Sequence, residues 1–275
     1  MANCNHQCDG CELSGNCSDE KRQDSFLINT NDYSNINKIY AVMSGKGGVG
    51  KSMVTSFLAS HLAKKGYRVA ILDADITGPS MGKEFGFEGQ TQGCEYGIIP
   101  METMTGIKVI SINMLLEKPS DPVVWRGPVI TGAVKQFYTD VYWGDVDYMY
   151  VDMPPGTGDV PLTVFQSLPI DGIIVVTSPQ DLVTMIVEKA VKMANMMDVP
   201  IVGIVQNMSY FECPNCHEKH YIFGKGKVEK VAEQYGIKNI ASLPISQDLA
   251  MLSDSGNMDC WEGKDLDNLV DVLTK

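Results

Sequence analysis

A glycine-rich segment with two lysines is the first place in this chain where residue types and spacing could do chemistry. It lies between an apolar run and a helical pattern and consists of Gly45, Lys46, Gly47, Gly48, Val49, Gly50, Lys51 and Ser52. Glycines let the backbone curve so that its N–H groups point inward, and the N-terminus of the following helix adds the positive end of its dipole. The spacing G-x4-G-K-S between a strand and a helix therefore predicts a site for the phosphates of a nucleotide.

Lys51 and Ser52 have the side chains that phosphate chemistry needs. A lysine at this position reaches the β- and γ-phosphates, and a serine hydroxyl is an oxygen ligand of the kind that Mg²⁺ prefers. We therefore expect ATP and Mg²⁺ to bind here. The alternative is a glycine-rich turn that binds nothing, and the flanking strand and helix argue against it.

Acidic residues follow two other apolar runs of the chain. Asp73 and Asp75 follow VAIL, and Asp152 follows YMYV. Ligands of open α/β sheets bind at the carboxyl ends of strands, and phosphoryl transfer depends on positioning and charge stabilisation. We expect Asp152 to act on Mg²⁺ or its water shell, Asp73 to lie near the metal, and Asp75 to orient or activate the attacking water. Aspartates at strand ends are also common helix caps and turn formers, and the phosphate loop is what favours the chemical roles.

Asn207 ends the apolar run PIVGIVQN. Its amide has a donor and an acceptor and could pair with adenine. The alternative is an asparagine that only forms a turn.

Six of the eight cysteines fall into two short clusters, so their spacing is informative. Cys213 and Cys216 form a C-x2-C pair that could share an iron-sulfur cluster or Zn²⁺, but either centre usually takes four ligands. A symmetric dimer would present two such pairs and complete a Cys₄ site. The competing interpretations are a mononuclear zinc site that adds His217 or His220, and a loop without a metal.

The second cluster lies at the N-terminus and consists of Cys4, Cys8, Cys11 and Cys17. Four thiolates within so short a segment are enough for one [4Fe-4S] cluster held by a single chain. Zinc or incidental cysteines are the alternatives. The two isolated residues, Cys94 and Cys260, are expected to be ordinary small side chains, buried or half-buried.

The pattern of apolar runs predicts an α/β fold. Residues 1–37 read as a Cys-rich tail and linker, and residues 38–275 as one ATPase domain. Seven strands are expected, at IYAVMS, VAILD, IKVISI, YMYVD, GIIVVTS, PIVGIVQN and NIASL, with helices at 51–65, about 128–141, 181–197, 226–235 and 263–274. Buried strands that alternate with helices indicate a mostly parallel sheet with helices on both faces.

Length and charge exclude several classes of partner. The chain has 275 residues and a formal net charge of -12, which would repel a nucleic-acid backbone. No apolar run is long enough to span a bilayer, and the polar N-terminus lacks the apolar region of a signal peptide. Clustered cysteines also suit a reducing compartment. We therefore expect a cytoplasmic protein with neither nucleic acid nor membrane as its partner.

Taken together, the motifs resemble those of the Mrp/ApbC family of iron-sulfur cluster carrier ATPases. They are GKGGVGKS, DADITGPS, WRGP, DMPPGTGD, SPQDL, QNMSYF and CPNC, and the resemblance covers roughly residues 38–275 in collinear order. The resemblance implies a homodimer, weak ATPase activity, a labile [4Fe-4S] cluster bridged between subunits by the C-x2-C pairs, and transfer to apo-proteins. The loop is also similar to the deviant P-loop of the MinD/ParA/nitrogenase iron-protein superfamily, which implies that Lys46 reaches the partner's nucleotide.

The N-terminal cysteines are similar to those of a subgroup related to the eukaryotic cytosolic scaffold, which has a ferredoxin-like N-terminal cluster. Two departures stand out. Cys4 is closer to Cys8 than the corresponding cysteine of that scaffold, and Met53 replaces a threonine that is common in related loops. Because Ser52 is retained, we expect Mg²⁺ binding to survive.

Three rival functions share some of these features. A positioning ATPase of the MinD/ParA type would share the nucleotide residues, but it needs a membrane or DNA surface, and the C-terminal segment EGKDLDNLVDVLTK is net acidic. An electron donor resembling nitrogenase iron protein would also bridge a cluster, but its cysteines lie in two separate loops. A zinc-stabilised binding module would explain the cysteines and leave the phosphate loop unexplained.

Overall fold

The computed structural model describes residues 26–116, 125, 127–179 and 183–274. Its strands are β1 (Asn35–Ser44), β2 (Val69–Asp73), β3 (Gly93–Cys94), β4 (Gly97–Ile98), β5 (Met101–Glu102), β6 (Lys108–Ile110), β7 (Asp145–Asp152), β8 (Gly172–Thr177), β9 (Ile201–Glu212), β10 (Lys219–His220) and β11 (Ile240–Pro244). Its α-helices are α2 (Lys51–Lys64), α3 (Met81–Glu84), α4 (Gly127–Thr139), α5 (Asp159–Ser167), α6 (Val183–Met197), α7 (Val228–Gln234), α8 (Gln247–Asp254) and α9 (Asp267–Leu273), and two short 3₁₀ helices are η1 (Ile112–Met114) and η2 (Met258–Cys260).

One nine-stranded sheet organises the described residues. Its order is β10-β9-β8-β1-β7-β2-β6-β5, with β11 paired to β9. The pairs among β11, β9, β8, β1, β7, β2 and β6 are all parallel, and only the two-residue strands β5 and β10 pair in the antiparallel sense. All seven expected strands are present, and the mostly parallel α/β fold is confirmed.

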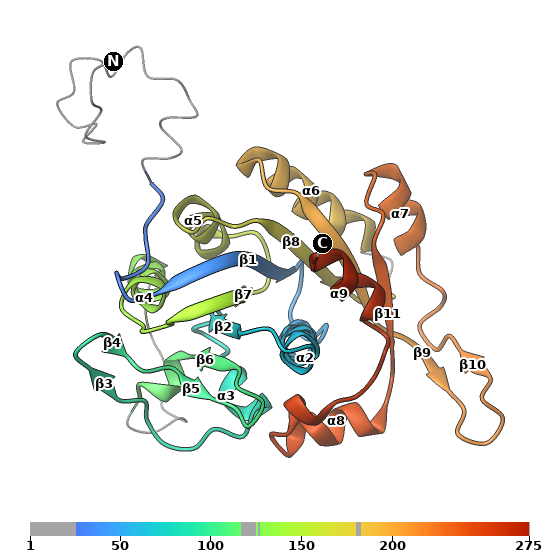
Figure 1. The fold of residues 1–275 in the computed structure, drawn as a ribbon. Helices are drawn as coiled ribbons and strands as arrows, with labels where there is room; N and C mark the ends of the chain where they lie inside the picture. The colour runs from blue at the N-terminus through green and yellow to red at the C-terminus, as the bar shows by residue number, and fades with distance from the viewer. Residues whose placement is uncertain (1–25, 117–124, 126, 180–182, 275) are drawn as a thin grey trace, which may run out of the picture.

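Helices cover both faces of the sheet, and each face has its own apolar core. Ile39, Ala41 and Met43 of β1 point into a core with residues of α4, α5, α6 and α7. Tyr40 and Val42 point to the opposite side, into a core with residues of α2, α8 and α9. This alternation follows from the two-residue period of a strand. Figure 1 shows α4, α5 and α6 on one side of the central strands and α2 on the other. Burial on both faces explains why these strands are continuous apolar runs.

The expected helices are found at α2, α4, α6, α7 and α9, with ends that differ by a few residues. The start of the expected helix 181–197 falls partly outside the described residues. Helices α3, α5 and α8 were not among the expected ones. They have between four and nine residues.

Residues 26–34, expected as part of a linker, contact the sheet domain. The N–H of Ile28 donates to the Ser167 carbonyl at 2.8 Å, and the Asn31 amide donates to the Val141 carbonyl at 2.8 Å. The first strand then begins at Asn35. Among the residues that the structure describes, none of the helices has the length and apolar character needed to cross a bilayer.

Candidate functional site

The glycine-rich loop connects the central strand β1 to α2, as the sequence predicts. Gly48 and Gly50 have φ angles of 76° and 79°, in the left-handed region that favours glycine. A Cβ at Gly45 would lie 2.5 Å from the Ile186 side chain, and one at Gly50 would overlap the Asn207 amide. In contrast, a Cβ at Gly47 or Gly48 would meet nothing within 4 Å. The loop is therefore packed at its two ends and open in the middle, where phosphates would approach.

The N-terminus of α2 completes this cradle. Its N-cap is Gly50, which offers no side-chain hydrogen bond, and the first turn has no acidic residue. The orphan N–H groups of a helix start and the positive end of its dipole favour an anion.

Lys51, Ser52 and Asp152 meet below the loop. Lys51 Nζ lies 2.6 Å from Asp152 Oδ2, and the two side chains are 6% and 0% exposed. The Ser52 hydroxyl donates to the same oxygen at 2.6 Å. The lysine that would reach the phosphates is paired with the aspartate that would act on Mg²⁺. The sequence predicts that these three residues share one site, as the structure shows. It does not predict the ion pair between Lys51 and Asp152.

Thr55 is a site residue that the sequence analysis missed. Its hydroxyl donates to Asp152 Oδ1 at 2.7 Å and is 3.1 Å from the Lys51 carbonyl oxygen. Thr55 is fully buried in α2, one turn after Lys51. The signal available in the sequence was a polar side chain at a buried position of the predicted helix.

Asp73 lies beside Asp152 because the two residues face each other across β2 and β7. The Ser111 hydroxyl donates to Asp73 Oδ2 at 2.8 Å, and the Asp75 N–H donates to Oδ1 at 3.0 Å. Burial, followed by the charge of Asp152, raises the pKa of Asp73 to about 7. Two buried carboxyl groups that lie close together favour either protonation of one of them or binding of a divalent cation between them.

Asp75 begins the loop that follows β2, and it is half-buried. Its Oδ1 accepts from the Thr77 hydroxyl at 3.3 Å and from the Gly78 N–H at 3.2 Å. Burial is the main cause that raises its pKa, and the Lys51 charge acts in the opposite direction. The influence of Lys51 on Asp75 puts this carboxyl near the phosphate site, where its role toward water stays a prediction.

The Asn207 amide contacts the phosphate loop. Its Nδ2 donates to the Val49 carbonyl at 2.9 Å, and its Oδ1 accepts from the Met208 N–H at 2.9 Å. This side chain is 1% exposed. Both ends of the amide thus bind backbone atoms, and pairing with adenine stays a prediction. Lys46 is half-buried, and its role toward a second chain also stays a prediction.

Cys213 and Cys216 lie in the tight turn between β9 and β10. The Cys213 N–H donates to the Glu218 carbonyl at 3.0 Å, and the His217 N–H donates to the Cys213 carbonyl at 2.9 Å. Hydrogen bonds from the backbone N–H groups of Cys216 and Asn215 lower the pKa of the Cys213 thiol. A lowered thiol pKa favours the thiolate, which is the form that binds metal.

The alternative zinc site within one chain finds no support in the described residues. There, no three His, Cys, Asp or Glu side chains are arranged to hold a metal ion. The His217 ring is instead 3.2 Å from a Glu212 carboxylate oxygen. The N-terminal residues Cys4, Cys8, Cys11 and Cys17 lie outside the described part of the chain.

The expectation for Cys94 and Cys260 was wrong, because both are exposed. Cys94 lies in the small β3–β4 hairpin, and Cys260 ends the short helix η2. Both residues of β3 are exposed, and the buried positions of η2 are Met258 and Asp259.

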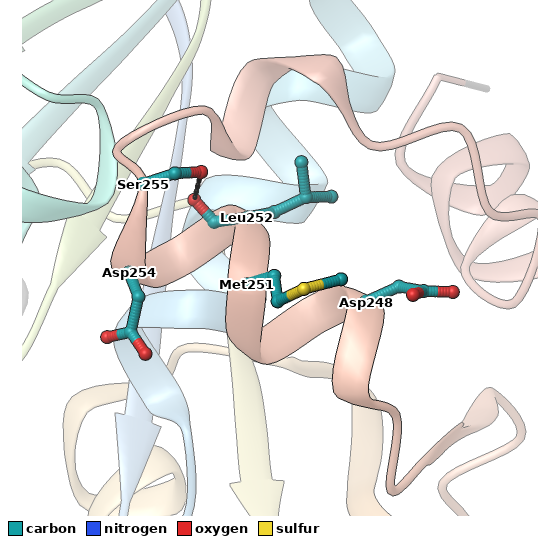
Figure 2. Close-up of a pocket in the computed structure, with 5 residues that line it drawn as sticks. All are labelled: Asp248, Met251, Leu252, Asp254 and Ser255. Carbon is teal, nitrogen blue, oxygen red and sulfur yellow. Dashed lines mark hydrogen bonds between the residues drawn. The ribbon is translucent and has the colours of Figure 1, made fainter.

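In the described part of the chain, three cavities lie away from the phosphate loop. One, of about 590 Å³, is an open hollow on α8 lined by Asp248, Met251, Leu252, Asp254 and Ser255. Figure 2 shows these side chains on the helix, with the Ser255 hydroxyl bonded to the Leu252 carbonyl. None of them belongs to the phosphate site or the cysteine turn.

Three features together define a P-loop NTPase. They are a mostly parallel sheet, a glycine-rich loop between its central strand and a helix, and a buried aspartate at the end of the neighbouring strand. The family model for ParA-type proteins described as "NUBPL iron-transfer P-loop NTPase" matches residues 35–272. The chain belongs to this family, and the resemblance to iron-sulfur cluster carriers is confirmed.

Relatives with known descriptions agree with this assignment. An iron-sulfur cluster carrier protein of Clostridium perfringens is 45% identical over 91% of this chain and 89% of its own length. One of Methanocaldococcus jannaschii is 42% identical over 98% of this chain and 96% of its own length. Each is described as a carrier of iron-sulfur clusters.

Solved structures agree as well. A nucleotide-binding protein of Archaeoglobus fulgidus, in complex with ADP, has a TM-score of 0.76 and 46% identity, and the match covers 83% of this chain and 90% of that one. The MinD protein in the MinC–MinD complex of Aquifex aeolicus has a TM-score of 0.60 and 18% identity over 86% of this chain and 94% of that one. The latter likeness shows the fold alone.

Proposed function

We propose that this chain binds and hydrolyses ATP, assembles a [4Fe-4S] cluster across a homodimer and transfers that cluster to apo-proteins in the cytoplasm. The observation that carries the proposal is the course of β9. Asn207 in this strand donates to the phosphate loop at Val49, and the strand ends at Glu212, directly before Cys213. One continuous strand thus connects a nucleotide site with a pair of thiols.

The nucleotide part of the proposal rests on the side chains below the loop. ATP would bind with its β- and γ-phosphates at Lys51, which exchanges Asp152 for the phosphates. Ser52 and Asp152 would hold Mg²⁺, with Asp73 beside them, and Mg²⁺ when bound supplies positive charge to the phosphate oxygens. Asp75 would orient the attacking water.

The cargo part of the proposal rests on the count of thiolates. Cys213 and Cys216 supply two of the four ligands that a [4Fe-4S] cluster takes, so a second copy of the chain would supply the others. Lys46 would reach the nucleotide of that second copy. The four N-terminal cysteines would hold a further cluster within one chain. Apo-proteins are the recipients, and neither a nucleic acid nor a membrane is proposed as a partner.

The experiment follows iron from carrier to recipient. The full chain is loaded with labelled iron and sulfide under anaerobic conditions and mixed with an apo-enzyme that needs a [4Fe-4S] cluster. We expect activation of that enzyme together with movement of the label, and loss of both in a Cys213→Ala/Cys216→Ala variant. The matched control is Cys94→Ala/Cys260→Ala, which removes two exposed thiols elsewhere. A cluster that stays bound and passes electrons during ATP turnover would instead identify an electron donor.

A further inference from the structure

The carboxylate of Asp152 is held on both of its oxygens. Oδ2 receives Lys51 and Ser52, each at 2.6 Å, and Oδ1 receives the Thr55 hydroxyl at 2.7 Å. Asp152 and Thr55 are both 0% exposed. The contact between Thr55 and Asp152 is therefore shielded from bulk solvent.

The Thr55 hydroxyl has one proton and two acceptors within reach. Asp152 Oδ1 is at 2.7 Å, and the Lys51 carbonyl oxygen is at 3.1 Å. The shorter contact is to a charged acceptor, and hydrogen bonds to charged acceptors are the stronger ones. The Thr55 hydroxyl therefore donates its hydrogen bond to the Asp152 carboxylate.

Nucleotide binding changes this arrangement, because one ammonium group cannot lie against both Asp152 and the phosphates. When Lys51 leaves, Asp152 Oδ2 loses a charged partner and keeps Ser52. The terminal torsion of an aspartate side chain has a broad range of allowed values. The orientation of the Asp152 carboxylate plane then needs another restraint. Thr55 can supply this restraint, because its hydroxyl donates to Asp152 Oδ1. Its place on α2 does not depend on where the Lys51 side chain points.

The neighbouring carboxyl group makes this restraint more important. Asp73 faces Asp152 across β2 and β7, and the positive charge of Lys51 acts on it. Once Lys51 has moved, the two acidic groups share a buried place that calls for a divalent cation. The orientation of the Asp152 carboxylate then affects the affinity of the site for that cation.

We propose that Thr55 is a positioning residue, which holds Asp152 by Oδ1 so that Oδ2 stays directed toward Ser52 and Mg²⁺ after Lys51 has moved to the phosphates. This inference rests on the proposed nucleotide function and adds a residue to it. Thr55 itself touches neither the phosphates nor the metal.

The test compares Thr55→Val, which removes the hydroxyl and keeps a β-branched side chain, with Thr55→Ser, which restores the hydroxyl. Binding of a fluorescent ATP analogue to the full chain is titrated first in EDTA and then with Mg²⁺. For Thr55→Val we expect the Mg²⁺ concentration at half-effect to rise about tenfold, the size of one hydrogen bond to a charged group. Binding in EDTA should change less than about twofold, and Thr55→Ser should return the Mg²⁺ midpoint toward that of the wild type.

Ser60→Ala is the matched control, because it removes another fully buried hydroxyl from α2 that bonds the Ser56 and Met258 carbonyls instead. Its Mg²⁺ midpoint should stay at the wild-type value. Thr55→Ala is measured in parallel, so that the test stands even if the valine variant does not fold.

The outcomes separate this inference from the proposed function. A wild-type chain that binds no nucleotide, or binds it without regard to Mg²⁺, would overturn both. A Mg²⁺-dependent wild type whose midpoint is unchanged in the Thr55 variants would overturn the inference alone. An equal shift in Ser60→Ala would also overturn it, because the effect would then be a general loosening of α2.

Discussion

The ion pair between Lys51 and Asp152 lies at the centre of the candidate phosphate site. Both side chains are almost completely buried, at 6% and 0% exposure. Removing one partner of such a pair leaves an uncompensated buried charge, which is strongly destabilising. In the proposed function this ammonium group also binds the phosphates, so it would have two tasks that alternate with nucleotide binding.

Substitution of Lys51 by alanine should affect both tasks. We expect loss of nucleotide binding, because the phosphates lose the cation that this chain supplies from the end of its loop. We also expect the free energy of unfolding without nucleotide to fall by about 3 kcal/mol, because Asp152 is left buried without its charged partner. Equilibrium binding of a fluorescent nucleotide and urea unfolding measure the two effects.

Lys46→Ala is the control for this prediction. Lys46 is proposed to act on the nucleotide of a second chain, so its removal should spare more of the binding and strongly reduce turnover. Near-normal turnover in both lysine variants would contradict the assignment of the site.

Asp73 makes stability depend on pH. Its folded-state pKa is raised to about 7, mainly by burial and then by Asp152, whereas the same carboxyl in an unfolded chain titrates near 3.8. Between these values the folded state binds the proton and the unfolded state does not, so stability falls as pH rises toward 7 and changes little above it. We expect Asp73→Asn to lack this decline.

The measurement is the difference in urea midpoint between wild type and Asp73→Asn at pH 5 and at pH 7.5, without metal. Other titrating groups, such as His61, whose pKa is lowered chiefly by burial, cancel in that difference. A gap between the two proteins that is the same at both pH values would refute the raised pKa.

At the scale of elements, the strands with continuous apolar runs could be predicted and the irregular elements could not. VAILD is β2 to the residue, because burial on both faces makes the whole strand apolar. The predicted strand at 200–207 is shorter than β9, which continues to Glu212. Its second half is stabilised by a local hairpin, in which Lys219 pairs with Glu212, and by a distant partner, because Pro244 pairs with Tyr210. The local pattern of residues 200–207 does not contain the pairing with Pro244.

The same distinction applies to the site. Spacing alone predicts the phosphate loop, because the glycines and Lys51 are consecutive in the chain. The contact of Asn207 with Val49 joins residues 158 positions apart and could not be predicted from either one. Helix α8 had a readable signal, since the hydroxyl of its N-cap Ser246 accepts from the N–H groups of Asp248 and Leu249.

The β9–β10 turn supports a prediction about iron content. Cys213→Ala/Cys216→Ala should lose about two irons per monomer, half of a shared [4Fe-4S] cluster, and part of the stability of the dimer. Iron analysis after anaerobic reconstitution and sedimentation at several protein concentrations measure these two losses.

Two comparisons bound this result. Cys94→Ala/Cys260→Ala should keep full iron. Deletion of residues 1–20, which include the four N-terminal cysteines, should remove about four irons per monomer without changing dimerisation. A monomer that keeps full iron at low concentration would contradict a shared cluster.

At the scale of the whole molecule, the phosphate loop and the cysteine turn belong to one sheet domain. The two sites are joined by β9, and six residue steps of a strand from Asn207 to Cys213 span about 20 Å. If nucleotide binding moves the phosphate loop, as we propose, it would also act on Asn207, which donates to that loop at Val49. Coupling between two sites requires that nucleotide bind the cluster-holding and cluster-releasing states with different affinities.

We therefore predict that the nucleotide state alters how readily the cluster of Cys213 and Cys216 leaves. The rate of label transfer to an apo-enzyme is measured without nucleotide, with ADP and with a non-hydrolysable ATP analogue, each with Mg²⁺. The rates should differ between these states in the wild type and converge in Lys51→Ala, which retains the cysteines and lacks nucleotide binding. Because coupling is reciprocal, loading the cluster should shift nucleotide affinity by the same factor. Equal transfer rates in all three nucleotide states of the wild type would mean that β9 joins the two sites in space and leaves them energetically independent.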